Sequence, residues 1–201
     1  MTISALELTG LRKSLRKQRR QMSHFQQCQS EFLVLNRLIR HPKFQHAKHI
    51  GLYLHAFGEI QTSKIIERCF ALGKTIYLPM ICNMNQQLTW VTISQHQYRN
   101  KRFAHHHLGM KEPMHNRGQH VSRLDLLLLP LLACDPKGTR IGMGGGFYDR
   151  TLASAPHRPY RLGIAHEFQF INKPLFKNVW DQSLDCLITP QKIRHFKRSK
   201  K

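Results

Sequence analysis

The most apolar run of the chain reads Leu124-Asp125-Leu126-Leu127-Leu128-Leu129-Pro130-Leu131-Leu132. Its leucines follow one another without alternating with polar residues. Continuous apolarity of this kind is typical of a parallel strand covered on both faces, whereas a half-exposed strand alternates. The run therefore predicts a central strand of a parallel sheet with helices on both of its faces.

Two strands and a helix precede this run. Residues 49–54 and 75–80 are short, apolar and β-prone, and we expect Pro79 to end the second of them. The residues between them predict a helix at 63–72, with Thr62 as its cap and Gly73 at its end. A strand, a helix and a strand within about thirty residues form a βαβ unit, which implies parallel pairing.

Two helices are expected to open the chain. Residues 5–22 carry a short leucine stripe between many Arg and Lys side chains. The capping-box pair Ser23 and Gln26 starts a second helix, which Pro42 stops. The predicted buried stripe of this second helix is Phe25, Cys28, Phe32, Leu35, Leu38 and Ile39.

The remaining segments complete an α/β pattern. We expect strands at 88–93, 161–165 and 184–189, a helix at 147–155, loops at 99–123 and 135–146, and a frayed basic tail at 192–201. The sum is a three-layer α/β protein with a mostly parallel central sheet and helices on both faces. We expect a single domain over residues 1–201, in which residues 1–40 form the N-terminal helices.

Charge is the most unusual feature of the composition. The 201 residues include 32 Lys and Arg against 11 Asp and Glu, a formal net charge of +21. Such a charge predicts an anionic partner and says nothing about fold. Nucleic acid is possible on charge alone, but no RNP-like aromatic pair and no KH-type loop supports it, and a solvated basic surface is the simpler interpretation.

The cysteines and the apolar segments bear on the compartment. Five cysteines are scattered without a close pair, which argues against a disulfide framework or a zinc knuckle and for a reducing compartment. No apolar run approaches the ~18 residues of a membrane span, and residues 1–9 lack a signal-peptide pattern. We therefore expect a cytoplasmic protein without a membrane partner, and a monomer.

The segment that points to chemistry reads Lys137-Gly138-Thr139-Arg140-Ile141-Gly142-Met143-Gly144-Gly145-Gly146-Phe147-Tyr148-Asp149-Arg150. It lies between the apolar strand and a predicted helix, where open α/β sheets bind ligands. Its glycines let backbone N–H groups approach an anion closely. The helix N-terminus, Arg140 and Lys137 add positive charge. The segment favours a phosphate group; the alternative is a bare structural turn.

Asp149 is an anion beside this expected anion site. The arrangement is sensible if a divalent cation lies between carboxylate and phosphate, since Mg²⁺ takes one or two carboxylates together with phosphate oxygens. No Lys-Ser/Thr pair follows the glycines, so the segment is not a Walker A motif. No acid lies about twenty residues on, so it is not a dinucleotide fingerprint.

Three other carboxylates are candidates for the same edge of the sheet. Glu59 closely follows the strand at 49–54, where it could hold paired N–H donors of a heterocycle or be a solvated loop residue. Asp181 and Asp185 precede the last strand. Either could reach a metal at that edge, or pair with one of the many basic residues.

The histidines suggest a transition-metal site. His105, His106 and His107, with His115 and His120, offer several imidazoles. Three consecutive residues do not present three ligands to one point in regular structure, so a basic solvated loop is the favoured interpretation.

The glycine segment from Gly138 to Arg150 resembles the signature of the 5-formyltetrahydrofolate cyclo-ligase family. Weaker matches occur in the right order: the basic opening from Leu11 to Ser23, the stretch from Tyr53 to Thr62, Gly73-Lys74 with Tyr77-Leu78-Pro79, and Leu129 to Asp135. The resemblance implies a ligase that cyclises 5-formyltetrahydrofolate to 5,10-methenyltetrahydrofolate. It implies that ATP and Mg²⁺ are needed, that the formyl oxygen is phosphorylated to an iminium phosphate, and that ADP and phosphate are released. The folate can carry a polyglutamate tail.

The resemblance also assigns roles residue by residue. It places around ATP the residues Arg12, Arg140, Ile141, Gly142, Met143, Gly144, Gly145, Gly146, Phe147 and Tyr148. It places around the reduced folate the residues Leu54, Glu59, Met143, Gly144, Gly145, Gly146 and Phe147. It gives Arg140 and Tyr148 catalytic roles and assigns Mg²⁺ to Asp149 and Asp181.

Three positions depart from the family pattern, and one of them is Cys134, a packing change where the family usually has Phe. Leu8 stands where the family often has Lys, and Lys13, Arg16 and Lys17 are the candidates to replace it; Met143 stands where many members have Arg. The alternative function is a catalytically inactive protein on the same scaffold that binds nucleotides or nucleic acid. A sugar-phosphate isomerase or a CoA-transferase-like protein rests on fold analogy alone.

Overall fold

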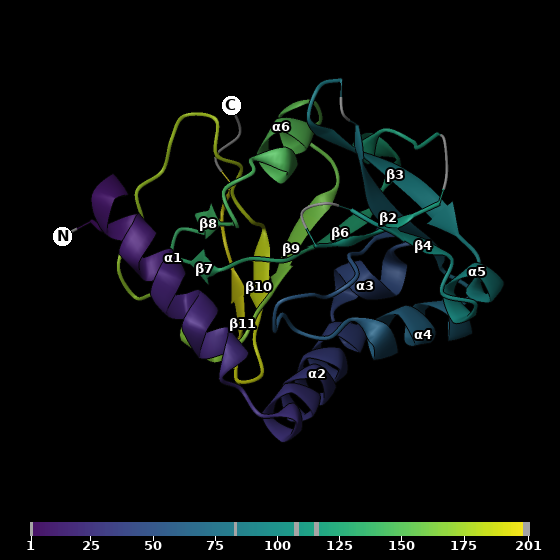
Figure 1. Cartoon of the computed structure of the whole chain (residues 1–201), viewed down its shortest axis with the longest axis horizontal. Coiled ribbons are helices and arrows are strands. Elements are labelled where there is room, and N and C mark those ends of the chain that lie inside the picture. The colour runs from purple at the N-terminus through teal and green to yellow at the C-terminus, as the bar shows by residue number, and fades with distance from the viewer. Residues whose placement is uncertain (1, 83, 107–108, 115–116, 199–201) are drawn as a thin grey trace.

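The computed structural model describes residues 2–82, 84–106, 109–114 and 117–198. A seven-stranded sheet runs through the molecule in the order β11-β10-β9-β6-β1-β2-β3 (Figure 1). The five inner strands are parallel, and β3 and β11 pair antiparallel at the two edges. The strands are β1 (His49–Gly51), β2 (Thr75–Cys82), β3 (Gln87–Ile93), β6 (Leu126–Leu129), β9 (Tyr160–Ile164), β10 (Cys186–Ile188) and β11 (Ile193–His195).

The leucine run forms the middle strand, as predicted. All four residues of β6 are fully buried. Leu126 and Leu128 belong to the hydrophobic cluster on one face of the sheet, whereas Leu127 and Leu129 belong to the cluster on the other. Successive side chains of a strand point to opposite faces, so a strand without polar residues needs a cover on both.

Helices supply that cover, which confirms the α/β fold class. The helices α2 (His24–Ile39), α3 (Pro42–His46) and α4 (Ser63–Ala71) contribute to one cluster, and α6 (Phe147–Ala153) contributes to the other. Figure 1 shows α6 on the opposite side of the sheet from α2, α3 and α4.

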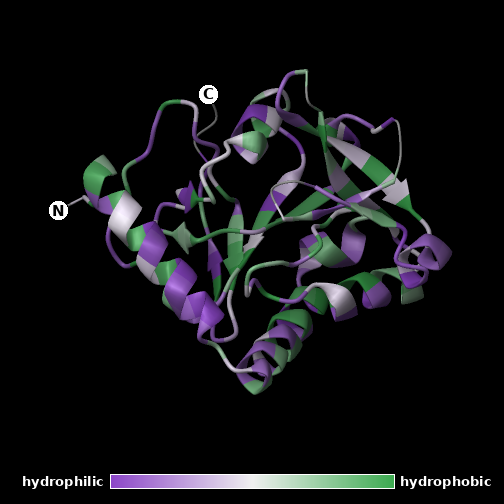
Figure 2. Cartoon of the chain, in the orientation of Figure 1, coloured by the Kyte–Doolittle hydropathy of each residue, from purple (hydrophilic) through white to green (hydrophobic). Residues whose placement is uncertain are grey.

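Helix α1 (Ala5–Arg20) packs away from the main sheet. Its Leu8 and Leu15 join Ala133, Ile141 and Leu175 in a third cluster. Two of these partners lie on a small antiparallel pair, β7 (Ala133–Cys134) and β8 (Arg140–Ile141). Figure 2 shows that the C-terminal half of α1 is hydrophilic over most of its surface. The predicted helix is therefore present, with a narrow apolar stripe.

The predicted buried face of α2 is partly wrong. The capping box of Ser23 and Gln26 begins the helix as expected, but Phe25 and Phe32 are 74% and 55% exposed. The helix instead buries Glu31, whose carboxylate accepts a hydrogen bond from the Lys64 backbone N–H at 3.1 Å. That donor is in the first turn of α4, where helix N–H groups lack partners within their own helix.

The same contact corrects the role of Thr62. Thr62 occupies the N-cap position of α4, but its side chain makes no capping hydrogen bond. Its hydroxyl donates instead to the Tyr53 carbonyl at 2.7 Å. The Thr62 hydroxyl therefore ties the start of α4 to the segment after β1, and Glu31 of α2 binds the N–H group in the first turn.

Strand β2 continues through Pro79, contrary to the prediction that it ends there. Strand β1 pairs with β2 only at Thr75–Tyr77, whereas β3 pairs with it from Ile76 to Cys82. Past Tyr77 the strand is bonded on one side, a position that tolerates a residue without an N–H group.

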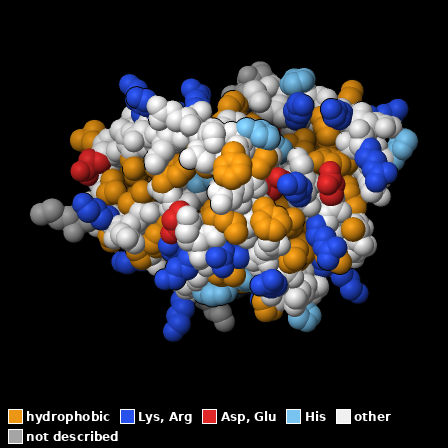
Figure 3. Space-filling view, turned by 90° about the horizontal axis from the view of Figure 1, so that it is seen from below, with side chains coloured by type: hydrophobic (Ala, Val, Ile, Leu, Met, Phe, Trp, Pro, Cys, Tyr) orange, Lys and Arg blue, Asp and Glu red, His pale blue; other side chains and the backbone are white. Residues whose placement is uncertain are grey.

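The structure contains further short elements that were not predicted, several of them within the predicted loop at 99–123. They are α5 (Gln95–Arg99), β4 (Phe103–His105), β5 (Lys111–Pro113), a 3₁₀ turn at Val121–Arg123 and another at Glu167–Gln169. The tail is not frayed at its start, because Ile193–His195 forms β11; residues 199–201 lie outside the described part. Among the described residues, no helix combines the length and apolarity that a membrane crossing requires. Figure 3 shows Lys and Arg spread over one face with few acidic side chains.

Candidate active site

All residues to which the family resemblance assigns a role line one cavity of about 720 Å³. Arg12 comes from α1, Leu54 and Glu59 from the segment after β1, and Asp181 from the segment before β10. The run from Arg140 to Asp149 forms another wall. Both β1 and β6 are parallel strands whose following segments reach the cavity, so it lies at the carboxyl edge of the sheet, where α/β proteins bind ligands.

The glycine segment connects β8 to α6 by a backbone that turns sharply. Gly144 and Gly146 have φ angles of +108° and +66°. Gly146 is the residue that caps α6, and a Cβ atom there would lie 2.8 Å from the Arg150 Nη1 atom. Positive φ is the region that L side chains rarely adopt. The glycines are therefore required for this path.

Two arginines that line the cavity, Arg12 and Arg140, have Nε donors without a partner among the described residues. Arg140 is 7% exposed, and its Nη2 atom donates to Asp149 Oδ1 at 2.8 Å. The Nε atoms of Arg12 and Arg140 are buried and make no hydrogen bond within the described part of the chain. Buried donors are usually paired, so these two N–H groups fit an anionic ligand such as phosphate.

Asp149 and Asp181 both border the cavity and fit a divalent cation. Among the described residues, the hydrogen bonds to Asp149 come from Arg140 and from the Gln182 N–H, and both reach Oδ1. Asp181 accepts the Asn178 N–H on Oδ2 at 2.8 Å. One oxygen of each carboxylate is left for another partner, and carboxylates are the protein ligands that Mg²⁺ prefers.

Glu59 also lines the cavity. Its side chain is 11% exposed and forms an ion pair with Arg19 at 3.6 Å, and its Oε2 atom accepts the Ala56 N–H at 3.1 Å. Burial raises the pKa of Glu59, while Arg19 and the Ala56 N–H act in the opposite direction. A buried ionised carboxylate accepts hydrogen bonds only, so Glu59 suits a ligand with N–H donors.

Two tyrosines complete this part of the cavity. Burial raises the pKa of Tyr53 and of Tyr148, and the Glu59 charge raises both further. Each is therefore a neutral phenol at pH 7. The Tyr53 hydroxyl donates to the Ile60 carbonyl at 3.4 Å, and the guanidinium carbon of Arg140 lies 5.6 Å from the centre of the Tyr148 ring.

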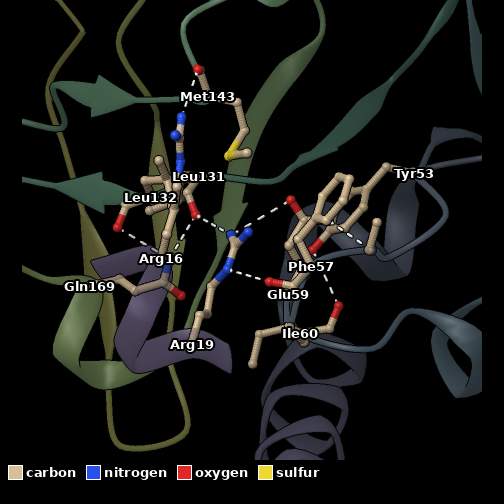
Figure 4. Close-up of polar contacts among 12 residues, drawn as sticks. Arg16, Arg19, Tyr53, Phe57, Glu59, Ile60, Leu131, Leu132, Met143 and Gln169 are labelled. Carbon is tan, nitrogen blue, oxygen red and sulfur yellow. Dashed lines mark hydrogen bonds and ion pairs between the residues drawn. The ribbon is translucent and has the colours of Figure 1, made fainter. Parts of the chain in front are cut away.

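The structure adds Arg16 to the residues beside the glycine segment. Its Nη2 atom donates to the Met143 carbonyl at 3.0 Å (Figure 4). Arg16 lies on the same helix as Leu8 and Arg12, at the helical spacing of four residues. That spacing was the available signal, but it did not separate Arg16 from Lys13 and Lys17.

Other residues singled out from the sequence lie outside this cavity or outside the described part of the chain. Lys137, expected to add charge to the anion site, lines a separate cavity of about 310 Å³. Asp185 accepts the Arg161 N–H and pairs with Arg198 at 3.2 Å, which is the structural alternative. His107 and His115 lie outside the described residues. His120 bonds Ser122 and Ser154, and so has partners other than a metal.

One group of possible metal ligands occurs among the described residues. Atoms of His41, Cys186 and His195 lie within 4.8 Å of one another. The His41 Nδ1 atom accepts the Lys43 N–H, so a neutral His41 ring carries its proton on Nε2. Neither nitrogen then has a free lone pair. Cys186 is at the start of the parallel strand β10, at the edge of the sheet opposite to the cavity.

Known proteins resemble this chain over most of its length. A model of the 5-formyltetrahydrofolate cyclo-ligase family matches residues 7–190. The 5-formyltetrahydrofolate cyclo-ligase of Escherichia coli (strain K12) is 31% identical over 191 residues, covering 89% of this chain and 98% of that protein. The protein of the same name from Haemophilus influenzae is 33% identical over 190 residues, covering 89% and 95%. The NMR structure of Aquifex aeolicus 5,10-methenyltetrahydrofolate synthetase superposes with a TM-score of 0.80 at 23% identity, covering 96% of this chain and 94% of that one. At that identity the likeness shows the fold alone.

Proposed function

The chain belongs to the 5-formyltetrahydrofolate cyclo-ligase family and is an enzyme of the ligase class, and we propose that it cyclises 5-formyltetrahydrofolate to 5,10-methenyltetrahydrofolate at the expense of ATP. The observation that carries the proposal is that the candidate residues all line one cavity of about 720 Å³. Its walls bring together Glu59, the glycine segment, and the two carboxylates Asp149 and Asp181.

The chemistry requires that the formyl oxygen become a leaving group. This oxygen takes the γ-phosphoryl group of ATP, and ADP departs. The resulting carbon–oxygen–phosphate unit carries an electron-poor carbon, which N10 of the folate attacks. Phosphate leaves with the former formyl oxygen, N10 loses its proton, and the new ring is closed. The protein has to align the two substrates and stabilise the charge that spreads over the transferred group.

Different residues of the cavity would bind the folate and the phosphate groups of ATP. Glu59 would accept the N–H donors of the pterin, beside Leu54. The backbone N–H groups from Ile141 to Phe147 and the guanidinium groups of Arg12 and Arg140 would hold the phosphates. Tyr148, partly buried and neutral because its pKa is raised, would contact the transferred group as a hydrogen-bond donor. Fixed dipoles and charges that line a binding site stabilise developing charge more strongly than water does.

In this proposal Mg²⁺ binds beside the phosphate groups of ATP. Asp149 and Asp181 would hold it through Asp149 Oδ2 and Asp181 Oδ1, which accept no hydrogen bond from the described residues. When bound, the ion neutralises charge on the ATP phosphates.

An absorbance assay tests the proposal. Purified protein is mixed with 5-formyltetrahydrofolate, ATP and Mg²⁺, and the methenyl chromophore is followed, with reactions lacking ATP or containing EDTA as controls. The proposal predicts product in the complete mixture and none in either control. Binding of ATP without product would support the inactive nucleotide-binding alternative and contradict the proposal.

A further inference from the structure

Arg19 is buried at the end of α1 and joins three segments of the chain. It is 1% exposed. Its Nε atom donates to the Phe57 carbonyl at 2.9 Å, and its Nη1 atom approaches the Leu131 carbonyl at 3.5 Å and Glu59 Oε1 at 3.6 Å. Figure 4 shows the guanidinium between the Leu131 carbonyl, which follows β6, and Glu59, which follows β1.

The turn that precedes Glu59 contains two residues with left-handed backbone angles. Phe57 and Gly58 both have positive φ, at +52° and +74°. A Cβ atom on Gly58 would lie 2.6 Å from the Arg19 carbonyl oxygen, and His166 Nε2 bonds the Gly58 carbonyl at 3.1 Å. Strained turns persist where the surrounding structure holds them, and they gather at functional sites. The backbone of helix α1 therefore packs directly against this turn and helps to hold its conformation.

Arg19 also sets the charge around Glu59. Burial favours the protonated carboxyl, and a protonated oxygen donates a hydrogen bond rather than accepting one. A guanidinium within about 4 Å favours the ionised form. Leu131 and Phe57 fix the guanidinium by their carbonyls, so its charge stays beside Glu59 whether or not a ligand is present.

We propose that Arg19 is a positioning residue that keeps Glu59 ionised and aimed into the cavity, and so makes this wall select a ligand with adjacent N–H donors. The inference rests on the proposed function, because it names how the folate side of the same cavity is prepared. Arg19 is not among the residues that the family resemblance places in contact with ATP or the folate.

The ionisation of Glu59 can be distinguished from that of the charged and titratable groups near the cavity. They are Arg16 and Arg19 on α1, Tyr53 after β1, Tyr148 on α6, His166 after β9, and Arg12, Lys111 and Arg140 in the cavity wall. Burial raises the pKa of both tyrosines and lowers the pKa of His166 to about 4. Arginine and lysine keep their charge near neutral pH. Burial also lowers the pKa of His55, four residues before Glu59, which favours its neutral form. Removal of Arg19 takes away the nearby positive charge that favours ionised Glu59, so we expect the Glu59 titration to move upward.

Calorimetry of ligand binding between pH 6 and 8.5 tests the proposal. For Arg19→Met, whose side chain replaces a buried charge by an apolar group, we expect the Kd for 5-formyltetrahydrofolate at pH 7 to rise at least tenfold, and the Kd for ATP to change less than twofold. The folate Kd of this variant should fall as pH rises, relative to a flat wild-type profile. Arg19→Lys, which keeps the charge, should restore the flat profile. Adding Glu59→Gln to Arg19→Met should abolish the pH dependence.

A control variant and an NMR titration of Glu59 complete the test. Arg20→Met, at the exposed neighbour on the same helix, is the matched control and should leave both Kd values unchanged. Carbon-13 NMR of glutamate carboxyls in the ligand-free chain should show Glu59 ionised at pH 7 in the wild type, and a midpoint raised by at least one pH unit in Arg19→Met. If Arg19→Met does not fold, the wild-type titration decides, because a Glu59 midpoint at or above pH 7 in the presence of Arg19 would overturn the proposal.

The possible failures are distinct. Equal losses of folate and ATP affinity, or a folate loss that does not depend on pH, would make Arg19 a structural residue and overturn the proposal. An unshifted Glu59 midpoint would do so without reference to any substrate. Failure of the proposed function would instead appear as a wild-type chain that makes no methenyl product.

Discussion

Arg140 and Asp149, nine residues apart, form an ion pair of 2.8 Å across the base of the glycine segment. Arg140 begins β8, and Asp149 lies in the first turn of α6. The Gln182 N–H reaches the same carboxylate oxygen. The pair therefore closes the glycine segment into a loop, and it keeps a cationic and an anionic group side by side where phosphate and a cation are expected to meet.

Asp149→Asn should remove metal-dependent turnover without unfolding the protein. Asn keeps the oxygen that accepts from Arg140 and Gln182 but lacks the charge that a cation needs. We expect kcat to fall at least ~100-fold, as for the loss of a major electrostatic contact, in a protein that is still folded at the assay temperature. Turnover would be measured across a Mg²⁺ titration.

The matched control is Asp125→Asn. Asp125 pairs with Arg158 at 2.7 Å and accepts the His49 N–H at the opposite edge of the sheet. This variant should keep the Mg²⁺ dependence of the wild type. Wild-type turnover in Asp149→Asn would remove Asp149 from the metal site.

Glu59→Gln should weaken the folate selectively. The amide keeps the shape of the side chain but presents an N–H₂ group to the ligand, and it leaves the Arg19 charge unpaired. We expect the KM for 5-formyltetrahydrofolate to rise ~10-fold or more, in line with ~1.4 kcal/mol for each tenfold, and the KM for ATP to stay within twofold. Steady-state kinetics with each substrate varied in turn would show this; an equal rise in both KM values would argue for a structural role.

Arg16→Met should affect the nucleotide more than the folate. It removes the hydrogen bond to the Met143 carbonyl, which helps to hold the glycine segment. We expect the KM for ATP to rise about fivefold, corresponding to roughly 1 kcal/mol for one hydrogen bond. Lys17→Met, at an exposed site on the same helix, is the control. Identical ATP kinetics in the two variants would show that the Arg16 contact is dispensable.

His166 should make stability depend on pH. Burial lowers its pKa to about 4, with the Gly58 carbonyl acting in the opposite direction. The unfolded chain binds a proton here below pH 6.5, which the native chain takes up only near pH 4. The contribution to stability is therefore complete above pH 6.5 and is lost as pH falls from 6.5 to 4.

Urea unfolding checks this expectation. Between pH 7.5 and 5.0 the wild type should lose about 2 kcal/mol more of its free energy of unfolding than His166→Gln does. Comparing the two proteins cancels the titration of the other histidines. A wild type and a variant with parallel pH profiles would show that His166 is not neutral and buried in solution.

The parts of the fold that follow from local pattern could be predicted. The leucines of β6 and the capping box at Ser23 each depend on neighbours in the sequence, and both are present. The buried face of α2 could not be predicted, because Glu31 is buried by its bond to Lys64, a partner 33 residues away. Hydrophobicity alone placed Phe32 in the core, although that side chain is exposed.

The same distinction applies to the site. The glycine segment is contiguous, so its path and its place beside Asp149 follow from the residues themselves. The family resemblance led to Glu59 and Asp181, which the fold brings to the same cavity. Arg19 was one of several basic residues of a basic helix, and nothing in the sequence shows that it is buried among the Phe57 and Leu131 carbonyls.

Oxygen transfer tests the central claim most directly. The substrate is 5-formyltetrahydrofolate with oxygen-18 in the formyl group, and the released phosphate is analysed by mass spectrometry after turnover with unlabelled ATP and Mg²⁺. Phosphorylation of the formyl oxygen predicts one oxygen-18 atom in each phosphate formed with methenyl product, and at least ~100-fold less labelled phosphate in the same time with Asp149→Asn. Methenyl product accompanied by unlabelled phosphate, or no product at all, would contradict the account.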